Sequence, residues 1–376
     1  MHTQLTRDDL IMVAKRENNQ KRSFLYVDPL QGKHVPVSPT RALQTMELLA
    51  QRVSEQYSGE TLLVIGFAET ATAIGAALAL SCPQVRAFLT TTREGLGDAE
   101  YLIFSESHSH ATEQRLYVQG LEEWLRCTDR VVFAEDEVTT GNTIGKLIAA
   151  LRARFPEIGM RFGIASLLNS MTEERLADFR AQGIPCTCLF HIPFGYRIGE
   201  TERFAYETPR TSPFLPERLQ SVLQTVPHAW NPRRAGSVQS IADSCERFAQ
   251  SALQMLSDCK PEMQILVLGT EECMYPGLFL GRTLERMGHQ VWFHATTRSP
   301  IETSKDAAYP LHFRALLRSL YDEERTTYVY DLRRYDKVII VTDAPAPSPA
   351  GLATLTGALE QCGNTDVTVL QWEDTE

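Results

Sequence analysis

The stretch that decides the fold is VVFAEDEVTTGNT, residues Val131–Thr143. Its four apolar residues favour a buried strand, and Glu135 and Asp136 follow at the carboxyl end of that strand. Small hydroxyl-bearing residues come next, and the apolar spacing in TIGKLIAALRARF then indicates a helix. A strand that ends in acids and leads through a short loop into a helix is typical of open α/β sheets, which bind ligands at the carboxyl ends of their strands.

Short apolar strands and helical stretches alternate on both sides of this segment. The expected strands are TLLVIGF, VRAFLTT and RFGIASLL in the first half, and MQILVLG, VWFHATT, DKVIIVTD and VTVLQW after Glu262. Strands that are apolar on both faces and separated by helices indicate a parallel sheet covered on both sides. We therefore predict the α/β class, with an open parallel sheet in each half of the chain.

The length of 376 residues exceeds what one hydrophobic core usually supports, so two domains are expected. We predict a first domain over residues 1–206 and a smaller, Rossmann-like α/β domain over residues 261–376. Residues 207–260, rich in proline and ending in an amphipathic helix, are the expected connection. Near the start, SFLYVDPLQGKHVPVS predicts a hairpin that turns at Gly32, and Ser38 and Pro39 suit the beginning of a helix.

Three segments recur in the same order in the two halves. LVIGFAETATAIGAALA from Leu63 is similar to LVLGTEECMYPGLFLG from Leu266, FLTTTR from Phe88 to FHATTR, and DRVVFAEDE to DKVIIVTDA from Asp336. The nearly constant offset favours an internal duplication. The alternative is that apolar strands ending in Gly or Asp recur in every sheet of this class.

Composition excludes several classes of function. The formal charge of −10 and the pI of about 5.5 argue against a broad nucleic-acid surface, which needs a basic face. No apolar stretch is long enough for a membrane helix, and MHTQLTRDDL lacks the apolar core of a signal peptide, so we expect a cytoplasmic protein. Cys186 and Cys188, near His191, lie in a strand-like run and are interpreted as buried thiols, with a metal site as the alternative.

The residues of the deciding stretch suit a sugar phosphate. Glu135 and Asp136 provide acceptors for ribose hydroxyls, or negative charge beside an oxocarbenium-like transition state. The loop after them lies at a helix start, where backbone N–H groups and the helix dipole attract a phosphate dianion. An ordinary strand-loop-helix with a capping threonine is the alternative. The loop residues are Thr139, Thr140, Gly141, Asn142 and Thr143.

With acids, loop and helix in this order, the segment resembles the phosphoribosyl pyrophosphate (PRPP) signature of type I phosphoribosyltransferases, especially the orotate type. It departs at Ala134, which is smaller than usual, and at Glu137, which adds a third acid. The resemblance implies the open-sheet fold of these enzymes with an N-terminal hood, a nucleobase-like acceptor, and a homodimer. It also implies Mg²⁺ that is bound through PRPP, without a dedicated set of protein ligands.

The same resemblance implies further site residues. Arg93, at the end of a strand, is expected to contact pyrophosphate, and the polar stretch after it to form a mobile cover. Within that stretch, His108 and His110 are expected to contact pyrophosphate or the leaving group, with a metal cluster or plain exposure as alternatives. The pyrophosphate loop itself comprises Ala68, Glu69, Thr70, Ala71 and Thr72.

Three of these assignments carry alternatives. Glu69 would repel pyrophosphate unless Mg²⁺ lies between them, so a helix cap is the other interpretation. Lys33 and His34 are assigned to the hood over the acceptor base, and a solvent-facing turn is their alternative.

The second half carries ATTRSP after a strand, and the whole chain resembles a two-domain bacterial family. In that family an orotate phosphoribosyltransferase-like domain precedes a domain named after its Thr-Arg-Ser-Pro motif. It is commonly encoded with tellurite-resistance and stress-response genes and is suspected of making or salvaging a nucleoside-like metabolite. The candidate residues are Glu272, the apparent counterpart of Glu69, and Thr297, Arg298 and Ser299 of the motif. Arg298 and Ser299 are expected to bind an anionic group or serve an interface, and an ordinary loop is the alternative.

A second complete PRPP site is not expected. The counterpart of the phosphate loop is APAPSPAG, and its prolines lack N–H donors. The expected function is thus one PRPP-dependent phosphoribosyl transfer to or from a nucleobase-like acceptor. A non-catalytic sensor of PRPP or a nucleotide is the alternative. A nucleotide hydrolase has little support, because no nucleophile motif or metal-ligand set stands out in the sequence.

Overall fold

The computed structural model describes residues 5–17, 23–95, 97, 99–104, 113–192, 199–211, 222–256, 259–260 and 262–374. The chain forms two compact units. The central unit comprises Gln44–Gly195 and Trp230–Ser244, and the terminal unit comprises Met1–Leu43, Tyr196–Ala229 and Cys245–Glu376. Each unit therefore contains segments that are far apart in the sequence.

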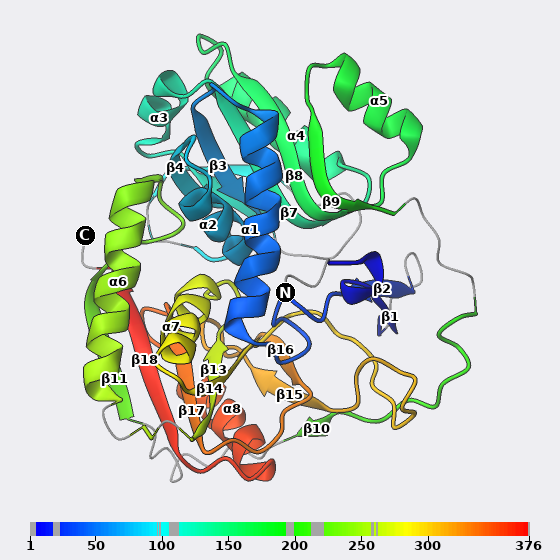
Figure 1. Ribbon diagram of the computed structural model, residues 1–376, viewed down its shortest axis with the longest axis vertical. Coiled ribbons are helices and arrows are strands. Elements are labelled where there is room, and N and C mark those ends of the chain that lie inside the picture. The colour runs from blue at the N-terminus through cyan, green and yellow to red at the C-terminus, as the bar shows by residue number, and fades with distance from the viewer. Residues whose placement is uncertain are drawn as a thin grey trace. The chain divides into compact units, whose positions relative to one another are not determined.

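The central unit is built on a six-stranded sheet in the order β12-β4-β3-β7-β8-β9 (Figure 1). All neighbouring strands are parallel except β12, which runs antiparallel to β4. The α/β class and the parallel sheet are thus confirmed. The strands are β3 (Leu62–Gly66), β4 (Val85–Thr90), β7 (Arg130–Val138), β8 (Arg161–Asn169), β9 (Cys186–His191) and β12 (Gly236–Ser237).

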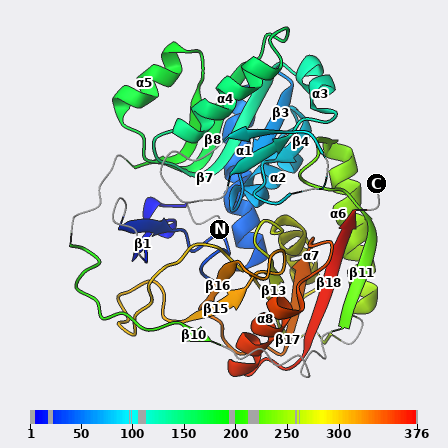
Figure 2. The ribbon, with the colours of Figure 1, turned by 180° about the vertical axis from the view of Figure 1, so that it is seen from behind.

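Helices cover this sheet because its central strands are apolar on both faces. All five residues of β3 are buried, and α2 (Ala71–Ser81), apolar around most of its surface, packs on β3 and β4. Right-handed crossovers place α2 and α4 (Asn142–Arg154) on opposite faces, since the chain leaves β3 and β7 in opposite directions. Figures 1 and 2 show α1 (Pro39–Gln56) and α4 on opposite faces. The unit is completed by α3 (Leu121–Cys127), α5 (Glu173–Ala181) and the hairpin of β5 (Tyr101–Phe104) and β6 (Gln114–Tyr117).

The terminal unit contains a second parallel sheet, in the order β11-β18-β17-β13-β14. Its strands are β11 (Val222–Ala229), β13 (Gln264–Gly269), β14 (Gln290–Ala295), β17 (Lys337–Thr342) and β18 (Val367–Asp374). Its helices are α7 (Tyr275–Arg286), α8 (Pro349–Gln361) and part of α6 (Val238–Met255). Two smaller sheets add β1 (Met12–Lys15) with β2 (Phe24–Val27), and β10 (Arg210–Thr211) with β15 (Arg314–Arg318) and β16 (Thr326–Tyr330).

The two large sheets repeat one topology. The order β4-β3-β7-β8 in the central unit corresponds to β14-β13-β17-β18 in the terminal unit, and in both an antiparallel hairpin precedes the third strand in the chain. Individual hydrogen bonds repeat as well. Thr91 N–H donates to the Gly66 carbonyl as Thr296 N–H does to that of Gly269, both at about the same length, 2.9 and 3.0 Å. These shared bonds support the internal duplication that the sequence indicates.

The N-terminal hairpin differs from the sequence prediction. The structure pairs β1 with β2, so the predicted turn at Gly32 is wrong. The residues after β2 lead instead to Val37, which forms a single bridge with Phe293 within the terminal unit. The alternation of apolar residues after Asp28 therefore reflects contacts with several partners, not a second strand.

The unit boundaries also differ from the predicted division. Residues 1–43 belong to the terminal unit, and the predicted connection at residues 207–260 contains β10, β11 and β12 as well as the predicted helix, α6. A linker was expected there because prolines interrupt the sequence, and the short edge strands leave no periodic pattern that would outweigh them. None of the helices in the described parts of the chain is long and apolar enough to cross a membrane.

Candidate functional site

The acids of the deciding stretch lie where the central sheet opens. Pairing of β7 with β3 ends at Ala134, opposite Gly66, whereas pairing with β8 continues to Val138. Glu135 and Asp136 are therefore the first residues of β7 beyond the end of β3, and both are partly exposed. Because the chain leaves β3 toward β4 and β7 toward β8, this position is the topological switch point of the sheet, where ligands bind in folds of this class.

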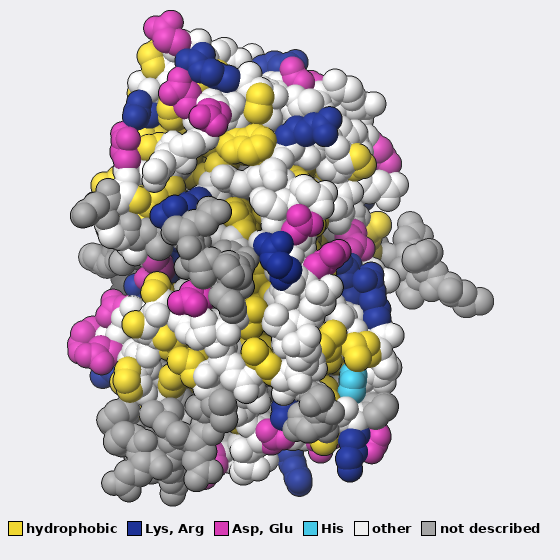
Figure 3. All heavy atoms as spheres, turned by 90° about the vertical axis from the view of Figure 1, so that its left-hand side faces the viewer, with side chains coloured by type: hydrophobic (Ala, Val, Ile, Leu, Met, Phe, Trp, Pro, Cys, Tyr) yellow, Lys and Arg dark blue, Asp and Glu magenta, His cyan; other side chains and the backbone are white. Residues whose placement is uncertain are grey.

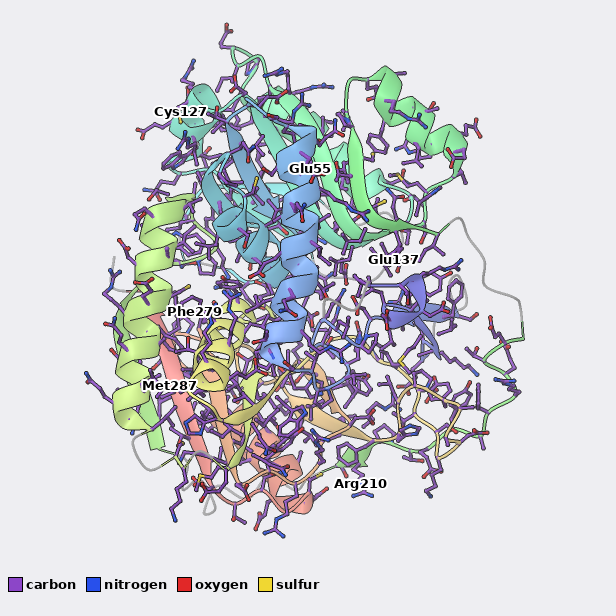
Figure 4. The ribbon with its side chains drawn as sticks, viewed as in Figure 1. Glu55, Cys127, Glu137, Arg210, Phe279 and Met287 are labelled. Carbon is purple, nitrogen blue, oxygen red and sulfur yellow. The ribbon has the colours of Figure 1, made fainter. Side chains whose placement is uncertain are left out.

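Each acid in this row has its own surroundings. Asp136 Oδ1 accepts a hydrogen bond of 2.9 Å from the Glu137 backbone N–H. Glu137, labelled in Figure 4, accepts a hydrogen bond from Ser170 Oγ at 3.1 Å. Side chains alternate along a strand, so Glu137 shares a face with Glu135 while Asp136 points to the other face. The third acid that departs from the resembled signature is thus tied to the loop after β8.

The predicted phosphate loop forms a turn into helix α4. Gly141 occupies the N-cap position with a φ of 70°, in the left-handed region. A Cβ at this position would lie 2.6 Å from the Phe179 ring and 3.2 Å from Met171 Sδ. Glycine is therefore required here for both backbone conformation and space. Thr139, Asn142 and Thr143 are partly exposed, and the N–H groups of the first helical turn lack intrahelical partners, as at any helix start.

Arg175, on α5, supports this loop and was not singled out by sequence. Its Nε donates a 3.0 Å hydrogen bond to the Thr140 carbonyl, and its guanidinium lies 4.6 Å from the centre of the Phe179 ring. A terminal nitrogen also lies 3.4 Å from Asn142 Oδ1. A cation next to a helix N-terminus adds to the attraction for an anion. No sequence pattern marks Arg175, because its contact joins α5 to the turn before α4.

The predicted pyrophosphate loop connects β3 to α2. The residues from Ala68 to Thr72 are all buried, with exposed fractions of 8% or less. Ala68 N–H donates to Thr91 Oγ1 at 2.8 Å, and Thr72 Oγ1 donates to the Glu69 carbonyl at 3.1 Å. The peptide bond between Ala68 and Glu69 is cis. The loop thus runs directly into the start of α2, across the switch point from Glu135 and Asp136.

The end of β4 lies next to this loop. Thr91 N–H bonds to Gly66 and Thr92 exchanges two backbone hydrogen bonds of 2.8 Å with Arg115 on β6, which holds the strand end between β3 and the hairpin. Arg93 follows directly and is partly exposed. Arg93 thus directly follows the bonded strand end, and its contact with pyrophosphate stays a prediction. His108 and His110, in the predicted cover, lie outside the described residues.

The two hood candidates lie in the terminal unit. His34 is buried, with its ring 5.7 Å from that of Tyr330 in an edge-to-face arrangement. Burial, reinforced by the charges of Lys33 and His294, holds the pKa of His34 well below its ordinary value. His34 is therefore neutral at neutral pH. Lys33 is partly exposed in the turn before it.

Two candidate residues of the terminal unit, Glu272 and Arg298, belong to a buried charged cluster centred on Glu271. Arg298 Nε lies 2.6 Å and Arg325 Nη1 3.1 Å from Glu271 Oε2, and Ser319 Oγ donates to the other oxygen. Glu272, the residue named from sequence, lies 3.9 Å from Arg298. Glu271, which adopts a φ of 47°, was not named from sequence because the alignment of the two halves pairs Glu272 with Glu69 and Glu271 with Ala68.

In the terminal unit, the segment that corresponds to the phosphate loop packs against other residues of the same unit. Ser348 caps α8 by accepting from Gly351 N–H, and its own N–H donates to the Leu320 carbonyl at 2.9 Å. A Cβ on Gly351 would lie 2.4 Å from the Ser319 carbonyl oxygen. The start of α8 is therefore packed against the turn between β15 and β16. Thr297 is fully buried in the motif turn, and its Oγ1 accepts from Ser299 N–H.

Cys186 and Cys188, the two neighbouring cysteines, lie on β9. Burial raises the pKa of the Cys186 thiol to about 11 and also raises that of Cys188, so both are protonated thiols at neutral pH. Among the described residues, no group of three or more His, Cys, Asp or Glu side chains is placed to hold a metal ion.

Figure 3 shows one face, on which basic and acidic side chains are interspersed.

Two family models each match one part of the chain. Residues 10–191 match the family model described as "Phosphoribosyl transferase". Residues 231–359 match the family model described as "TRSP domain C terminus to PRTase_2". The two families thus occur in the order that the second description states. No curated protein matches the chain.

Solved structures of low sequence identity are similar to part of the chain. Adenine phosphoribosyltransferase from Rhodothermus marinus is 16% identical over 49% of this chain and 96% of its own, with a TM-score of 0.33. The enzyme from Giardia lamblia, complexed with 9-deazaadenine, is 14% identical over 49% and 95%, with a TM-score of 0.36. Orotate phosphoribosyltransferase from Aeropyrum pernix is 17% identical over 48% and 88%, with a TM-score of 0.30.

Proposed function

We propose that this chain, a phosphoribosyltransferase followed by a TRSP domain, transfers the phosphoribosyl group between PRPP and a nucleobase-like acceptor. The observation that carries the proposal is the placement of two acids and a glycine-containing helix start on one strand-loop-helix at the switch point of the central sheet. The transfer is reversible in principle, so pyrophosphate-driven release of the base uses the same residues.

Each part of the site supplies one function in this proposal. Glu135 and Asp136 accept hydrogen bonds from the ribose hydroxyls, and the turn at Gly141 binds the 5′-phosphate through the N–H groups at the start of α4. The loop before α2, together with Arg93, binds pyrophosphate. These three parts follow the carboxyl ends of β7, β3 and β4, which lie next to one another in the sheet, and this arrangement supports the proposal that one PRPP molecule contacts all three.

The chemistry is a substitution at C1′ of the ribose. The bond from C1′ to the pyrophosphate oxygen breaks, a bond from C1′ to a base nitrogen forms, and the base nitrogen loses its proton. Positive charge develops on the ring as the leaving group departs. Carboxylates held beside the ring stabilise that charge more than they stabilise the uncharged sugar, which is the basis of their effect on rate.

Mg²⁺ belongs to the proposal as a companion of PRPP. When bound, it offsets the negative charge of the pyrophosphate group. The oxygens of Glu135 and Asp136, partly exposed at the end of β7, are ligands of the type that Mg²⁺ prefers, so the residues present fit such an ion. The chain's own contribution is to orient the ribose and both phosphate ends.

Replacing both acids tests the assignment. We expect Glu135→Gln with Asp136→Asn to reduce transfer to background while the midpoint of urea unfolding stays close to that of the wild type, because both side chains are partly exposed. Glu137→Gln is the matched control, since it removes an acid from the same strand that is bonded to Ser170. Unchanged turnover in the double variant, or equal loss in the control, would contradict the roles of these acids.

The acceptor is identified with labelled PRPP and a panel of nucleobases and related heterocycles. Release of labelled pyrophosphate with one of them supports transfer and names the acceptor. Mass spectrometry of small molecules retained by the purified protein provides an independent test. Binding of PRPP without release for any acceptor would instead indicate a sensor.

A further inference from the structure

We infer that Arg233 is a positioning residue for the pyrophosphate half of the PRPP site. The inference rests on the function proposed above. Arg233 lies outside the region that matches the phosphoribosyl transferase family, residues 10–191, and inside the TRSP match, residues 231–359. The structure nevertheless includes it in the central unit, with Trp230–Ser244. The second family region thus supplies a residue to the first site.

The segment that carries Arg233 is bound along β4. Thr90 N–H donates to the Pro232 carbonyl at 2.7 Å, and β12 extends the central sheet by pairing Gly236 with Phe88 and Ser237 with Ala87. The Trp230 ring lies 5.7 Å from that of Phe88. These contacts join the segment to the last residues of β4, the strand that ends beside the pyrophosphate loop.

The Arg233 side chain reaches one residue beyond β4. Arg233 is 4% exposed, and its Nε donates to Thr92 Oγ1 at 3.1 Å. Thr92 is fully buried, and its Oγ1 also accepts from Glu94 N–H at 3.0 Å. Two hydrogen bonds to one hydroxyl therefore fix the backbone on both sides of Arg93. Arg93 is the residue expected to contact pyrophosphate.

The same strand end fixes the loop itself. Thr91, which precedes Thr92, accepts from Ala68 N–H through its Oγ1 and donates its own N–H to Gly66. A displacement of Thr92 would therefore move both Arg93 and the start of the pyrophosphate loop. The phosphate loop at Gly141 follows β7 and shares none of these bonds. Arg233 should consequently affect the pyrophosphate end of PRPP and leave the 5′-phosphate end unchanged.

A purely structural role for Arg233 predicts a different result. If the side chain only stabilised the edge of the sheet, its loss would weaken all ligands equally and lower the midpoint of unfolding. The two roles separate when PRPP is compared with ribose 5-phosphate, which lacks the pyrophosphate group but retains the ribose and the monoester.

The experiment measures dissociation constants of PRPP, with Mg²⁺, and of ribose 5-phosphate for the full chain. We expect Arg233→Gln to weaken PRPP binding at least about tenfold, as the loss of a charged hydrogen bond generally does, and ribose 5-phosphate binding less than about twofold. Arg233→Lys should be intermediate, because lysine keeps the charge without the planar fork. Arg234→Gln, in the same turn and partly exposed, is the matched control and should bind both ligands as the wild type does.

Variants of Thr92 keep the test valid if Arg233→Gln does not fold. Thr92→Ser retains the hydroxyl and should bind PRPP like the wild type, whereas Thr92→Val should reproduce the selective loss. Equal effects on both ligands, or unchanged PRPP binding in Arg233→Gln, would overturn the role of Arg233 alone. A wild-type chain that binds no PRPP would overturn the proposed function, and the inference with it.

Discussion

Gly141 shows how a single residue sets the geometry of the candidate site. Its φ of 70° and the Phe179 ring, 2.6 Å from an added Cβ, together exclude any side chain. The turn can therefore pack closely against α5 while Asn142 and Thr143, at the start of α4, stay partly exposed. Arg175 holds the same turn from α5 through the Thr140 carbonyl. We therefore expect the turn to change little when a ligand binds, which would lower the entropy cost of binding.

Gly141→Ala should disrupt this turn. A left-handed alanine costs about 1–2 kcal/mol, and the clash with Phe179 adds a further ~1–3 kcal/mol. We expect a lower urea midpoint and weaker binding of ribose 5-phosphate, measured by denaturation and calorimetry.

Gly183→Ala is the control for this substitution. Gly183 has a φ of 73° with no atom within 4 Å of an added Cβ, so it reports the backbone cost alone. If both variants lost the same stability and both bound ribose 5-phosphate normally, the steric role of Gly141 would be refuted.

The role of a residue can be predicted from sequence where the local backbone, or its place at the end of an element, requires that residue type. Glycine at a helix start and acids at a strand end have such reasons, so the β7–α4 segment was predictable. Arg175 and Arg233 have none, because each is defined by a partner far away in the chain, Thr140 and Thr92 respectively. Glu271 was missed for a related reason, since its partners Arg298, Ser319 and Arg325 are distant in sequence and the alignment pairs Glu272 with Glu69 instead.

At the scale of elements, the two halves share a topology but differ at the ends of their strands. Ala68 and Glu271 occupy equivalent positions, since each donates its N–H to the equivalent threonine, Thr91 or Thr296. In the terminal sheet the acid at this position is paired with Arg298 and Arg325. The arginine of the TRSP motif thus binds a carboxylate of its own unit.

Glu271→Gln should therefore destabilise the terminal unit. Removing the carboxylate leaves two guanidinium groups, 10% and 17% exposed, without their shared partner. Breaking a buried ion pair in this way costs ~3–5 kcal/mol, so the urea midpoint should fall markedly.

Glu122→Gln on α3 provides the comparison. It removes an ion pair with Arg126 in which both side chains are about half exposed, 51% and 55%, and such pairs contribute less than ~1 kcal/mol. Equal effects of the two substitutions on the urea midpoint would show that the Glu271 cluster does not stabilise the unit.

The elements that sequence predicts best are those whose pattern is local. β3, β13 and β17, and β7 up to Ala134, are built on apolar runs and appear where expected. The pairing of β1 with β2 and of β12 with β4 could not be predicted, because strands of four and two residues carry too few positions for a periodic signal. Their partners are chosen by tertiary contacts.

For the whole molecule, the duplication raises the question of how many donor sites one chain contains. In the central sheet Asn142 and Thr143, at the start of α4, are partly exposed, whereas the terminal sheet covers the start of α8 with Ser319 and Leu320. We therefore expect one PRPP to bind per chain, measured by equilibrium dialysis with labelled PRPP at saturating Mg²⁺. Asp136→Asn with Glu135→Gln should weaken that single binding event. A stoichiometry of two would show that the terminal sheet also accepts the donor.

The order in which the chain visits its two units has a consequence for synthesis. The central unit needs Trp230–Ser244 for its edge strand, and the first 43 residues belong with segments that follow Cys245. Because a ribosome makes the chain from its amino end, Met1–Leu43 are synthesised before the segments they pack with, and the central unit lacks its edge strand until Trp230–Ser244 have been made. Cutting the chain between the two family matches would likewise remove β12 from the central sheet.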